Sequence, residues 1–275
     1  MEKKKRSVWW IWLIFIIVGT ICLVAGVLGL NYVDPKTKLE KEDFTVIYKD
    51  DIQNLEIESG VCKFNIVRTD NDYISLEGVN VPKGRYTEKV IGNTLKIQYH
   101  EKRILGFINV GTFIKEMVGE ITLYLPEKEY RSLEFDAGVG VNRISDLTLR
   151  ELDFDGGVGE YYLDNITVYG ETDFDLGVGE TEMTDCILNV SDIDVGVGDM
   201  TFAGQLWGDT NVDTGVGDVV LNIDGYKDEF IINTDKGVGD IDINEGTNTV
   251  ADDYEPRSKY LDLDCGVGDV TVNFK

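Results

Sequence analysis

The sequence predicts an all-β fold: a β-solenoid of about 19–20-residue coils, wound from one chain and preceded by one N-terminal transmembrane helix. The first observation is a repeat. The tripeptide Gly-Val-Gly occurs seven times, at successive spacings of 19, 20, 19, 19, 22 and 29 residues. This period is too short for a pair of helices and fits one coil of a β-solenoid. The second observation is the alternation of polar and apolar residues around each tripeptide, which is typical of β-strands.

The N-terminal segment has the features of a membrane anchor. Residues 8–30 carry no charge, and a helix of about 20 apolar residues crosses a hydrocarbon core. Four basic residues at positions 3–6 favour a cytoplasmic N-terminus. We therefore expect a cytoplasmic tail at 1–7, a helix at 8–30, a juxtamembrane linker at 31–43 and an extracellular remainder. The alternative is a cleaved signal peptide, but its apolar region usually spans only about 7–15 residues.

The expected extracellular part is strongly acidic. Of the 26 basic and 51 acidic residues in the chain, four and one precede the apolar segment, which leaves 22 and 50 beyond it and a net charge of −28. Such a surface repels nucleic acid, which we exclude as a partner. It also repels anionic lipid headgroups and anionic wall polymers.

The regular repeats occupy residues 131–275, and aligning them on the first glycine gives columns of constant chemistry. Apolar residues stand three positions before this glycine, and acidic residues stand two positions before it. We expect the first column to face the core and the second to face solvent, with the glycines at a corner and the valine between them inside the core. A third short strand at 147–149, 166–168 and 187–189 would make each coil roughly triangular. The first glycines of the predicted turns are Gly138, Gly157, Gly177, Gly196, Gly215, Gly237 and Gly266.

Residues 44–130 are expected to form atypical capping coils, because a terminal coil must cover an exposed core. Residues 55–62 look like a degenerate coil in which Cys62 replaces the second glycine, and 93–99 and 121–125 read as further strands. The apolar stretch 104–118 is a lid over this end or, alternatively, a segment that touches the membrane surface. The polar segment 244–259 is expected to be a surface loop.

The acidic column two residues before the glycines is the one arrangement that could carry chemistry. One interpretation is structural: each carboxylate accepts amide hydrogens of the following corner, as in an Asx-turn. The other is that stacked carboxylates bind Ca²⁺ or Mg²⁺. We favour the turn, and so predict no resident cofactor or metal, with Ca²⁺ as the alternative. The column consists of Asp136, Asp155, Asp175, Asp194, Asp213, Asp235 and Asp264.

An enzyme is not predicted. His100 is the single histidine, and no serine or cysteine is placed to use it as a base. The three cysteines beyond the apolar segment, Cys62, Cys186 and Cys265, fall on separate coils, too far apart for a disulfide, and are expected to be buried packing residues.

The strand Leu123–Pro126, followed by coils such as Asp194-Val-Gly-Val-Gly-Asp199, resembles the bacterial domain-of-unknown-function family called toast-rack, also labelled "putative adhesin". The resemblance covers residues 44–275. It implies a β-solenoid on the outside of the cell, near membrane proteins of the envelope-stress response. We therefore expect a single-pass, non-enzymatic interaction or sensing module that binds an envelope protein. The alternative is a surface adhesin that binds a foreign protein or carbohydrate, with or without a cation.

Overall fold

The computed structural model describes residues 40–100, 119–246 and 259–275. These residues form one 18-stranded sheet that winds into a β-solenoid. In this part of the chain, no helix is long and apolar enough to cross a membrane. The predicted transmembrane helix at 8–30, the apolar segment 104–118 and most of the predicted loop at 244–259 lie outside the described residues.

The elements, in chain order, are β1 Lys41–Tyr48, β2 Asn54–Glu58, β3 Val61–Thr69, β4 Ile74–Pro82, β5 Tyr86–Ile91, β6 Thr94–Tyr99, β7 Gly119–Pro126, β8 Glu129–Asp136, β9 Val139–Asp155, β10 Val158–Val168, β11 Thr172–Leu188, β12 Ser191–Leu206, β13 Thr210–Val216, β14 Val219–Ile223, the 3-10 helix η1 Lys227–Glu229, β15 Phe230–Val238, β16 Ile241–Asn244, β17 Lys259–Val267 and β18 Val270–Phe274.

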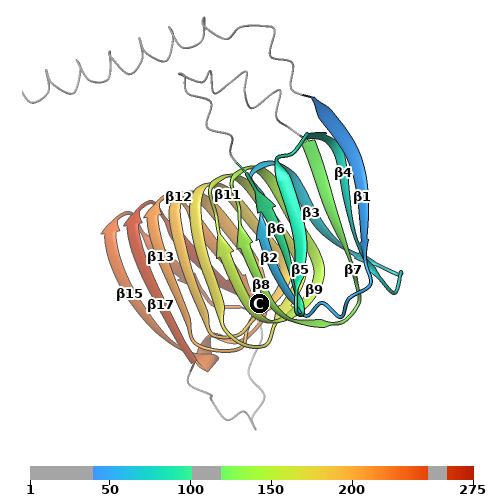
Figure 1. Cartoon of the computed structure of the whole chain (residues 1–275). Helices are drawn as coiled ribbons and strands as arrows, with labels where there is room; N and C mark the ends of the chain where they lie inside the picture. The colour runs from blue at the N-terminus through green and yellow to red at the C-terminus, as the bar shows by residue number, and fades with distance from the viewer. Residues whose placement is uncertain (1–39, 101–118, 247–258) are drawn as a thin grey trace, which may run out of the picture.

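The coils stack in parallel and in register, so that equivalent residues of neighbouring coils lie side by side. Along β9, β10 and β11, for example, Val139 pairs with Val158 and Val158 with Val178. Long strands such as β9 and β11 run around the corners of the coil (Figure 1). A second kind of corner is formed by Asp146, Asn165 and Asp185, which have φ of 56°, 54° and 52°. Asn and Asp tolerate this left-handed conformation better than most residues, so they can replace glycine here.

The core of the solenoid is a stack of the apolar column predicted from the repeat. Phe135 and Phe154 stack with their ring centroids 5.3 Å apart, and Phe174 follows at 5.7 Å from Phe154. All three side chains are at most 1 % exposed. Because each ring is covered by the coils before and after it, burial in this column depends on the stacking of neighbours.

The Gly-Val-Gly corner brings the backbones of adjacent coils very close together. Gly198 has φ of +143°, and a Cβ at this position would lie 1.7 Å from the carbonyl oxygen of Gly179. The prediction that the intervening valine points into the core is wrong. Six of these valines are 46–69 % exposed and form a row along the corner: Val158, Val178, Val197, Val216, Val238 and Val267.

At the C-terminal end the coils do not stack in the order of the sequence. The last segment of the chain, β17 and β18, lies between β13–β14 on one side and β15–β16 on the other. The coil at the end of the stack is therefore the one formed by β15 and β16, as seen at the orange end of Figure 1. The final coil is enclosed between two others.

The N-terminal end shows the same exchange of order. Strands β2 and β3 lie between β6–β7 and β8–β9. This position was not predicted, but Cys62 pairs with Gly140, as expected for a coil in which Cys62 takes the place of the second glycine. Antiparallel strands then cover this end: β5 pairs with β6, and β4 lies between β1 and β7.

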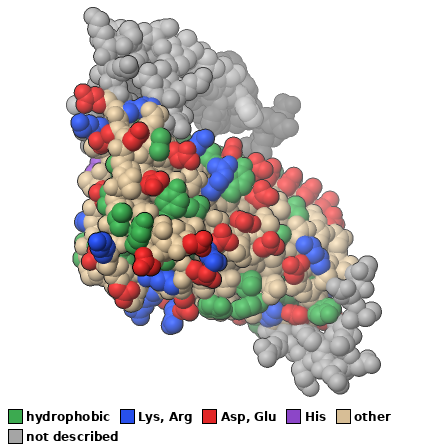
Figure 2. Space-filling view, turned by 90° about the vertical axis from the view of Figure 1, so that its right-hand side faces the viewer, with side chains coloured by type: hydrophobic (Ala, Val, Ile, Leu, Met, Phe, Trp, Pro, Cys, Tyr) green, Lys and Arg blue, Asp and Glu red, His purple; other side chains and the backbone are tan. Residues whose placement is uncertain are grey.

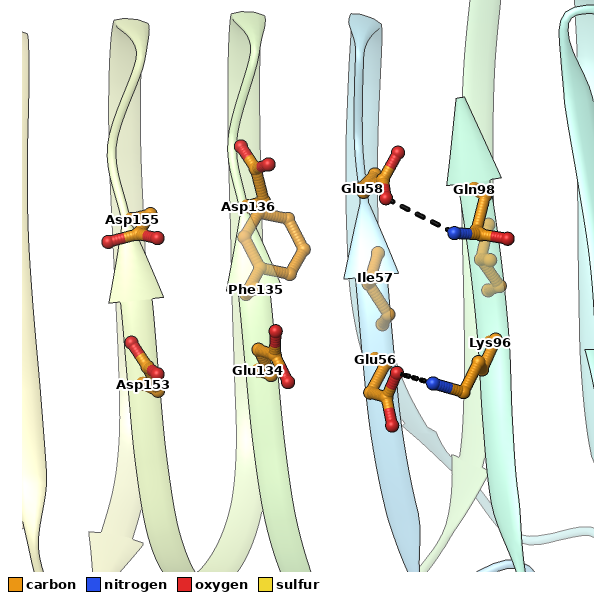
Figure 3. Close-up of a pocket in the computed structure, with 11 residues that line it drawn as sticks. Glu56, Ile57, Glu58, Lys96, Gln98, Glu134, Phe135, Asp136, Asp153 and Asp155 are labelled. Atoms are coloured by element: carbon orange, nitrogen blue, oxygen red, sulfur yellow. Dashed lines mark hydrogen bonds and ion pairs between the residues drawn. The ribbon is translucent and has the colours of Figure 1, made fainter. Parts of the chain in front are cut away.

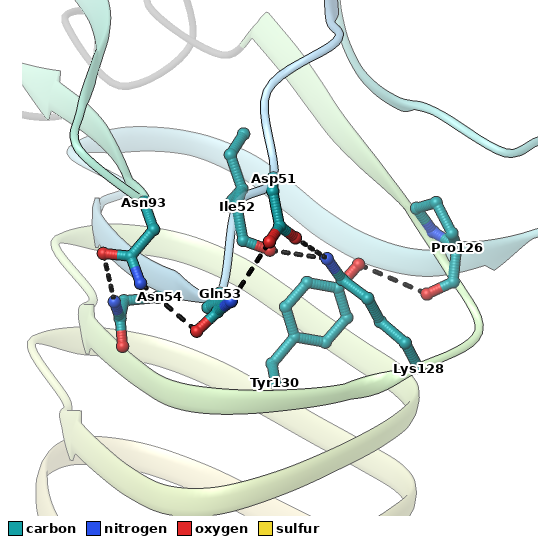
Figure 4. A network of polar contacts seen from close by, with 8 residues as sticks. All are labelled: Asp51, Ile52, Gln53, Asn54, Asn93, Pro126, Lys128 and Tyr130. Carbon is teal, nitrogen blue, oxygen red and sulfur yellow. Dashed lines mark hydrogen bonds and ion pairs between the residues drawn. The ribbon is translucent and has the colours of Figure 1, made fainter.

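A polar network fixes the point where the chain returns from β7 to β8 (Figure 4). Lys128 Nζ donates to the carbonyl oxygen of Ile52 at 2.6 Å and lies 3.7 Å from Asp51. Tyr130, which is fully buried, donates its hydroxyl to the carbonyl of Pro126 at 3.2 Å. The Lys128 contacts join the turn before β8 to the segment before β2, and the Tyr130 bond holds β8 to the end of β7. Together they stabilise the exchanged order.

Candidate functional site

The acidic column two residues before the corner glycines forms a continuous row along one side of the solenoid. The register makes it eight positions long, because Glu58 of β2 pairs with Asp136 and extends the predicted row. In spatial order the row is Glu58, Asp136, Asp155, Asp175, Asp194, Asp213, Asp264 and Asp235. The aspartates predicted from the sequence are thus brought together, with the last two in exchanged order.

A second row runs parallel to the first, four residues before the glycines. Its members in spatial order are Glu56, Glu134, Asp153, Asp173, Asp192, Asn211, Asp262 and Asn233. Because side chains alternate along a strand, both rows point outward while the apolar residue between them points into the core. We call the two rows together the acidic face.

The two asparagines in the second row relieve its charge. Asn211 Nδ2 donates to Asp192 at 3.0 Å, and Asn233 Nδ2 donates to Asp262 at 2.6 Å. Each asparagine therefore separates or ends a run of carboxylates and satisfies one of them.

At the N-terminal end, strand β6 closes both rows (Figure 3). Lys96 forms an ion pair with Glu56, and Gln98 Nε2 donates to Glu58 at 3.3 Å. These side chains and their acidic neighbours line a shallow hollow of about 110 Å³. The sequence alone did not indicate Lys96 and Gln98, because they precede the repeats and reach the acidic rows only through strand pairing.

Asp and Glu side chains are spread over the surface of the molecule seen in Figure 2, and on the acidic face they are crowded enough to affect one another's pKa. The pKa of Asp155 is raised by partial burial and then by the charges of Asp153, Asp136 and Asp175. The pKa of Asp194 is raised in the same way, by burial and then by Asp192 and Asp213. Stacked at about 4.8 Å, two such charges repel by roughly 0.9 kcal/mol even in a water-like dielectric. The face is therefore a concentrated negative surface that a cationic group would stabilise.

The Asx-turn role proposed for the first row is not what the described residues show, because the corner amides bond to backbone carbonyls. Val158 N–H donates to the carbonyl of Gly138 at 2.8 Å, and Gly156 N–H donates to that of Asp175 at 2.6 Å. A different acidic column, three residues after the first glycine, accepts backbone amides. Asp199 Oδ1 accepts from Asp218 N–H at 3.0 Å, and Asp218 Oδ1 accepts from Asp269 N–H at 2.9 Å.

This finding separates two kinds of acidic residue that look alike in the sequence. The column after the corner is used by the fold, since its carboxylates bind amides of the next coil. The acidic face has no comparable bond to a corner amide in the described chain, so its carboxylates other than Glu56, Glu58, Asp192 and Asp262 are left for interactions outside the fold. The signal for the distinction is structural, because the repeat shows both columns as acidic and outward-facing and does not show which of them accepts amides.

The alternative interpretation of the acidic column, a metal site, depends on whether its carboxylates gather around one point. Within the described residues, no group of three or more Asp, Glu, His or Cys side chains is arranged to hold a metal ion. The carboxylates of the acidic face lie in open rows, one per coil, whereas Ca²⁺ takes six to eight oxygen ligands gathered around one point.

The remaining candidate residues have structural surroundings. Cys62, Cys186 and Cys265 are free and buried, as predicted. Burial raises the pKa of the Cys62 thiol to about 12, and that of Cys186 to about 11, so both stay protonated at neutral pH. His100 is exposed and its Nε2 lies 2.8 Å from the hydroxyl of Thr87.

Comparison with known proteins places the chain in a family. Similar solved structures include a putative adhesin from Bacteroides fragilis, with 15 % identity, 85 % of this chain and 98 % of that chain covered, and a TM-score of 0.46. Another is a putative adhesin from Parabacteroides merdae, with 11 % identity, 87 % of this chain and 98 % of that chain covered, and a TM-score of 0.43. A putative lipid binding protein from Parabacteroides distasonis is also similar, with 13 % identity, 84 % of this chain and 98 % of that chain covered, and a TM-score of 0.30. No curated protein matches the sequence. The Toastrack DUF4097 family matches residues 52–272, about four-fifths of the sequence, and the chain therefore belongs to this family.

Proposed function

We propose that this chain is a membrane-anchored module on the outside of the bacterial cell, which binds a cationic protein of the envelope through its acidic face. The observation that carries the proposal is the pair of in-register acidic rows, whose carboxylates are not used by the corners of the fold. The function is recognition, with no reaction and no resident cofactor.

Charge and anchoring both support a partner at the membrane. An acidic body repels anionic lipids and wall polymers, so the solenoid stands away from them and its acidic face stays accessible. The uncharged segment 8–30, with its basic flank, supports an anchor that holds the N-terminus in the cytoplasm. We extend the proposal to a role in envelope stress, which requires that the bound partner be a protein of the envelope-stress response.

The proposal is tested in cells that produce the full chain with a photo-crosslinking residue at position 194, on the acidic face. Protease added to intact cells should remove the acidic region, and ultraviolet light should link position 194 to a membrane or envelope protein. Position 180 lies in the column after the corner and serves as the matched control, which should give little or none of this product.

Three outcomes would contradict the proposal. Protection of the acidic region from protease would place the solenoid inside the cell. Equal crosslinking from positions 180 and 194 would mean that the acidic face does not make the contact. If crosslinks form only when host proteins are added, the adhesin alternative holds instead.

A further inference from the structure

The terminal coils at the two ends of the solenoid differ in the strands that cover them. At the N-terminal end, the coil of β2 and β3 is covered by β6 and β7, which are themselves paired with antiparallel strands. At the C-terminal end, β15 pairs with β17 and β16 pairs with β18, and no other described strand pairs with either. Among the residues that the structure describes, this end therefore presents an open sheet edge.

The core is also less covered at this end. In β17, Leu261 and Leu263 are at most 2 % exposed. Their register partners in β15 are Ile232, which is only partly buried, and Thr234, which is exposed. Ile243 of β16 is likewise partly buried. Within the described part of the chain, the inward side chains of the last coil thus lack the covering layer that each interior coil receives from its neighbour.

The backbone at this edge has the orientation needed for pairing. In the interior coils, the residue five positions before the first glycine donates its amide to the next coil, as Thr172 does to Val190 at 3.0 Å. The residue one position before that glycine does the same, as Gly156 does to Asp175. Ile232 and Lys236 hold these two positions in β15, so their amides should face the open side. An edge of this kind is a template for an added strand.

The opposite end shows which chemistry completes such an edge. Strand β6 covers β2 in parallel and places Leu95 and Ile97 in the core. It sets Lys96 and Gln98 against the two acidic rows (Figure 3). On β15 the rows end in Asn233 and Asp235. The equivalent strand would place an amide opposite Asn233 and a basic residue opposite Asp235.

We infer that the β15 edge is a docking site for an extended segment of a partner protein that adds in parallel as the next strand. This segment alternates apolar residues, which cover Ile232 and Thr234, with polar ones, of which the residue opposite Asp235 is lysine or arginine. The inference goes beyond the proposed function, because it concerns the end of the solenoid and not its acidic face.

The test uses the purified full chain in mild detergent and two dye-labelled peptides based on β6. The first, Asn-Thr-Leu-Gln-Ile-Lys-Tyr, exchanges the lysine and glutamine of β6 to match β15. The second has glutamate in place of that lysine. Fluorescence anisotropy should show saturable binding of the lysine peptide and about tenfold weaker binding of the glutamate peptide, because a cross-strand attraction becomes a repulsion.

Variants locate the binding. Asp235→Lys should reverse the preference between the peptides, while Asp194→Lys, in the same row but in an interior coil, should leave it unchanged. Thr234→Pro should weaken binding of both peptides, because proline disturbs the edge. Its folding is checked by circular dichroism, and the charge reversal tests the inference even if this variant does not fold.

Three results would overturn the inference. Equal affinity for the two peptides would remove the predicted charge match. Reversal by Asp194→Lys as well would place the peptide on the acidic face. A dimer of the wild-type chain that binds neither peptide and dissociates on Thr234→Pro would mean that a second copy occupies the edge.

Discussion

Replacing Gly198 by alanine should lower the free energy of unfolding by at least about 3 kcal/mol, because a steric clash and backbone strain add up at this residue. The added Cβ would lie 1.7 Å from the backbone oxygen of Gly179, and the backbone has φ of +143°, which L-residues rarely adopt. The neighbouring coil cannot yield without losing its own register. Urea unfolding of the full chain in mild detergent, followed by circular dichroism, measures the effect.

Gly84 provides the matched control for this substitution. It also has a positive φ, of +66°, but a Cβ there would meet no atom within 4 Å. Gly84→Ala should cost only about 1–2 kcal/mol, the ordinary penalty of a left-handed conformation. Equal losses for the two variants would mean that backbone conformation, and not the close approach of the coils, accounts for the glycines.

The second large effect tests the exchanged order of the coils. Leu261 and Ile232 are register partners in β17 and β15, and both point inward. Leu261 is fully buried between two coils, so Leu261→Ala should cost about 2–5 kcal/mol. Ile232 lies in the last coil and is only partly buried, so Ile232→Ala should cost less than half as much. The same unfolding measurement compares them.

A stack in sequence order predicts the opposite ranking. In that arrangement β17 would lie at the open end and β15 in the interior, so Ile232→Ala would be the more damaging change. The comparison between the two variants is informative because both remove a similar aliphatic side chain from equivalent positions of the coil.

The sequence predicted the coil well because one period determines it. The inward column, from Phe135 to Leu263, and the outward acidic column follow from alternation along a strand, and both are found in the structure. Alternation fails at the corner. The glycines shift its phase, so Val197 and its equivalents point outward although counting by twos places them inside.

The order of the coils could not be predicted from the columns. Every coil presents the same apolar and acidic columns, so any coil can stack on any other, and pattern alone does not distinguish neighbours. The spacings of 22 and 29 residues before the last two repeats were the available signal, since they provide the extra chain needed to pass over one position. The use of Lys96 and Gln98 to close the acidic rows follows only from strand pairing.

The central claim is that the acidic face binds a cationic protein segment through the arrangement of its carboxylates and not merely through the net charge of the chain. One variant replaces four aspartates of the face with asparagine, at Asp155, Asp175, Asp194 and Asp213. Its control also removes four charges, from the column after the corner: Glu160→Gln, Glu180→Gln, Asp199→Asn and Asp218→Asn. Both sets are changed to amides of similar shape.

The most direct measurement is the affinity of a labelled oligolysine peptide for the wild-type chain and these two variants at the same ionic strength. We expect the face variant to bind about tenfold more weakly, and the control to stay within about threefold of wild type. Binding should also weaken on acidification, and at a higher pH than an ordinary aspartate would allow, because burial and neighbouring carboxylates raise the pKa of Asp155 and Asp194. Equal losses of affinity in the two variants would contradict the claim, since only the total charge of the chain would then matter.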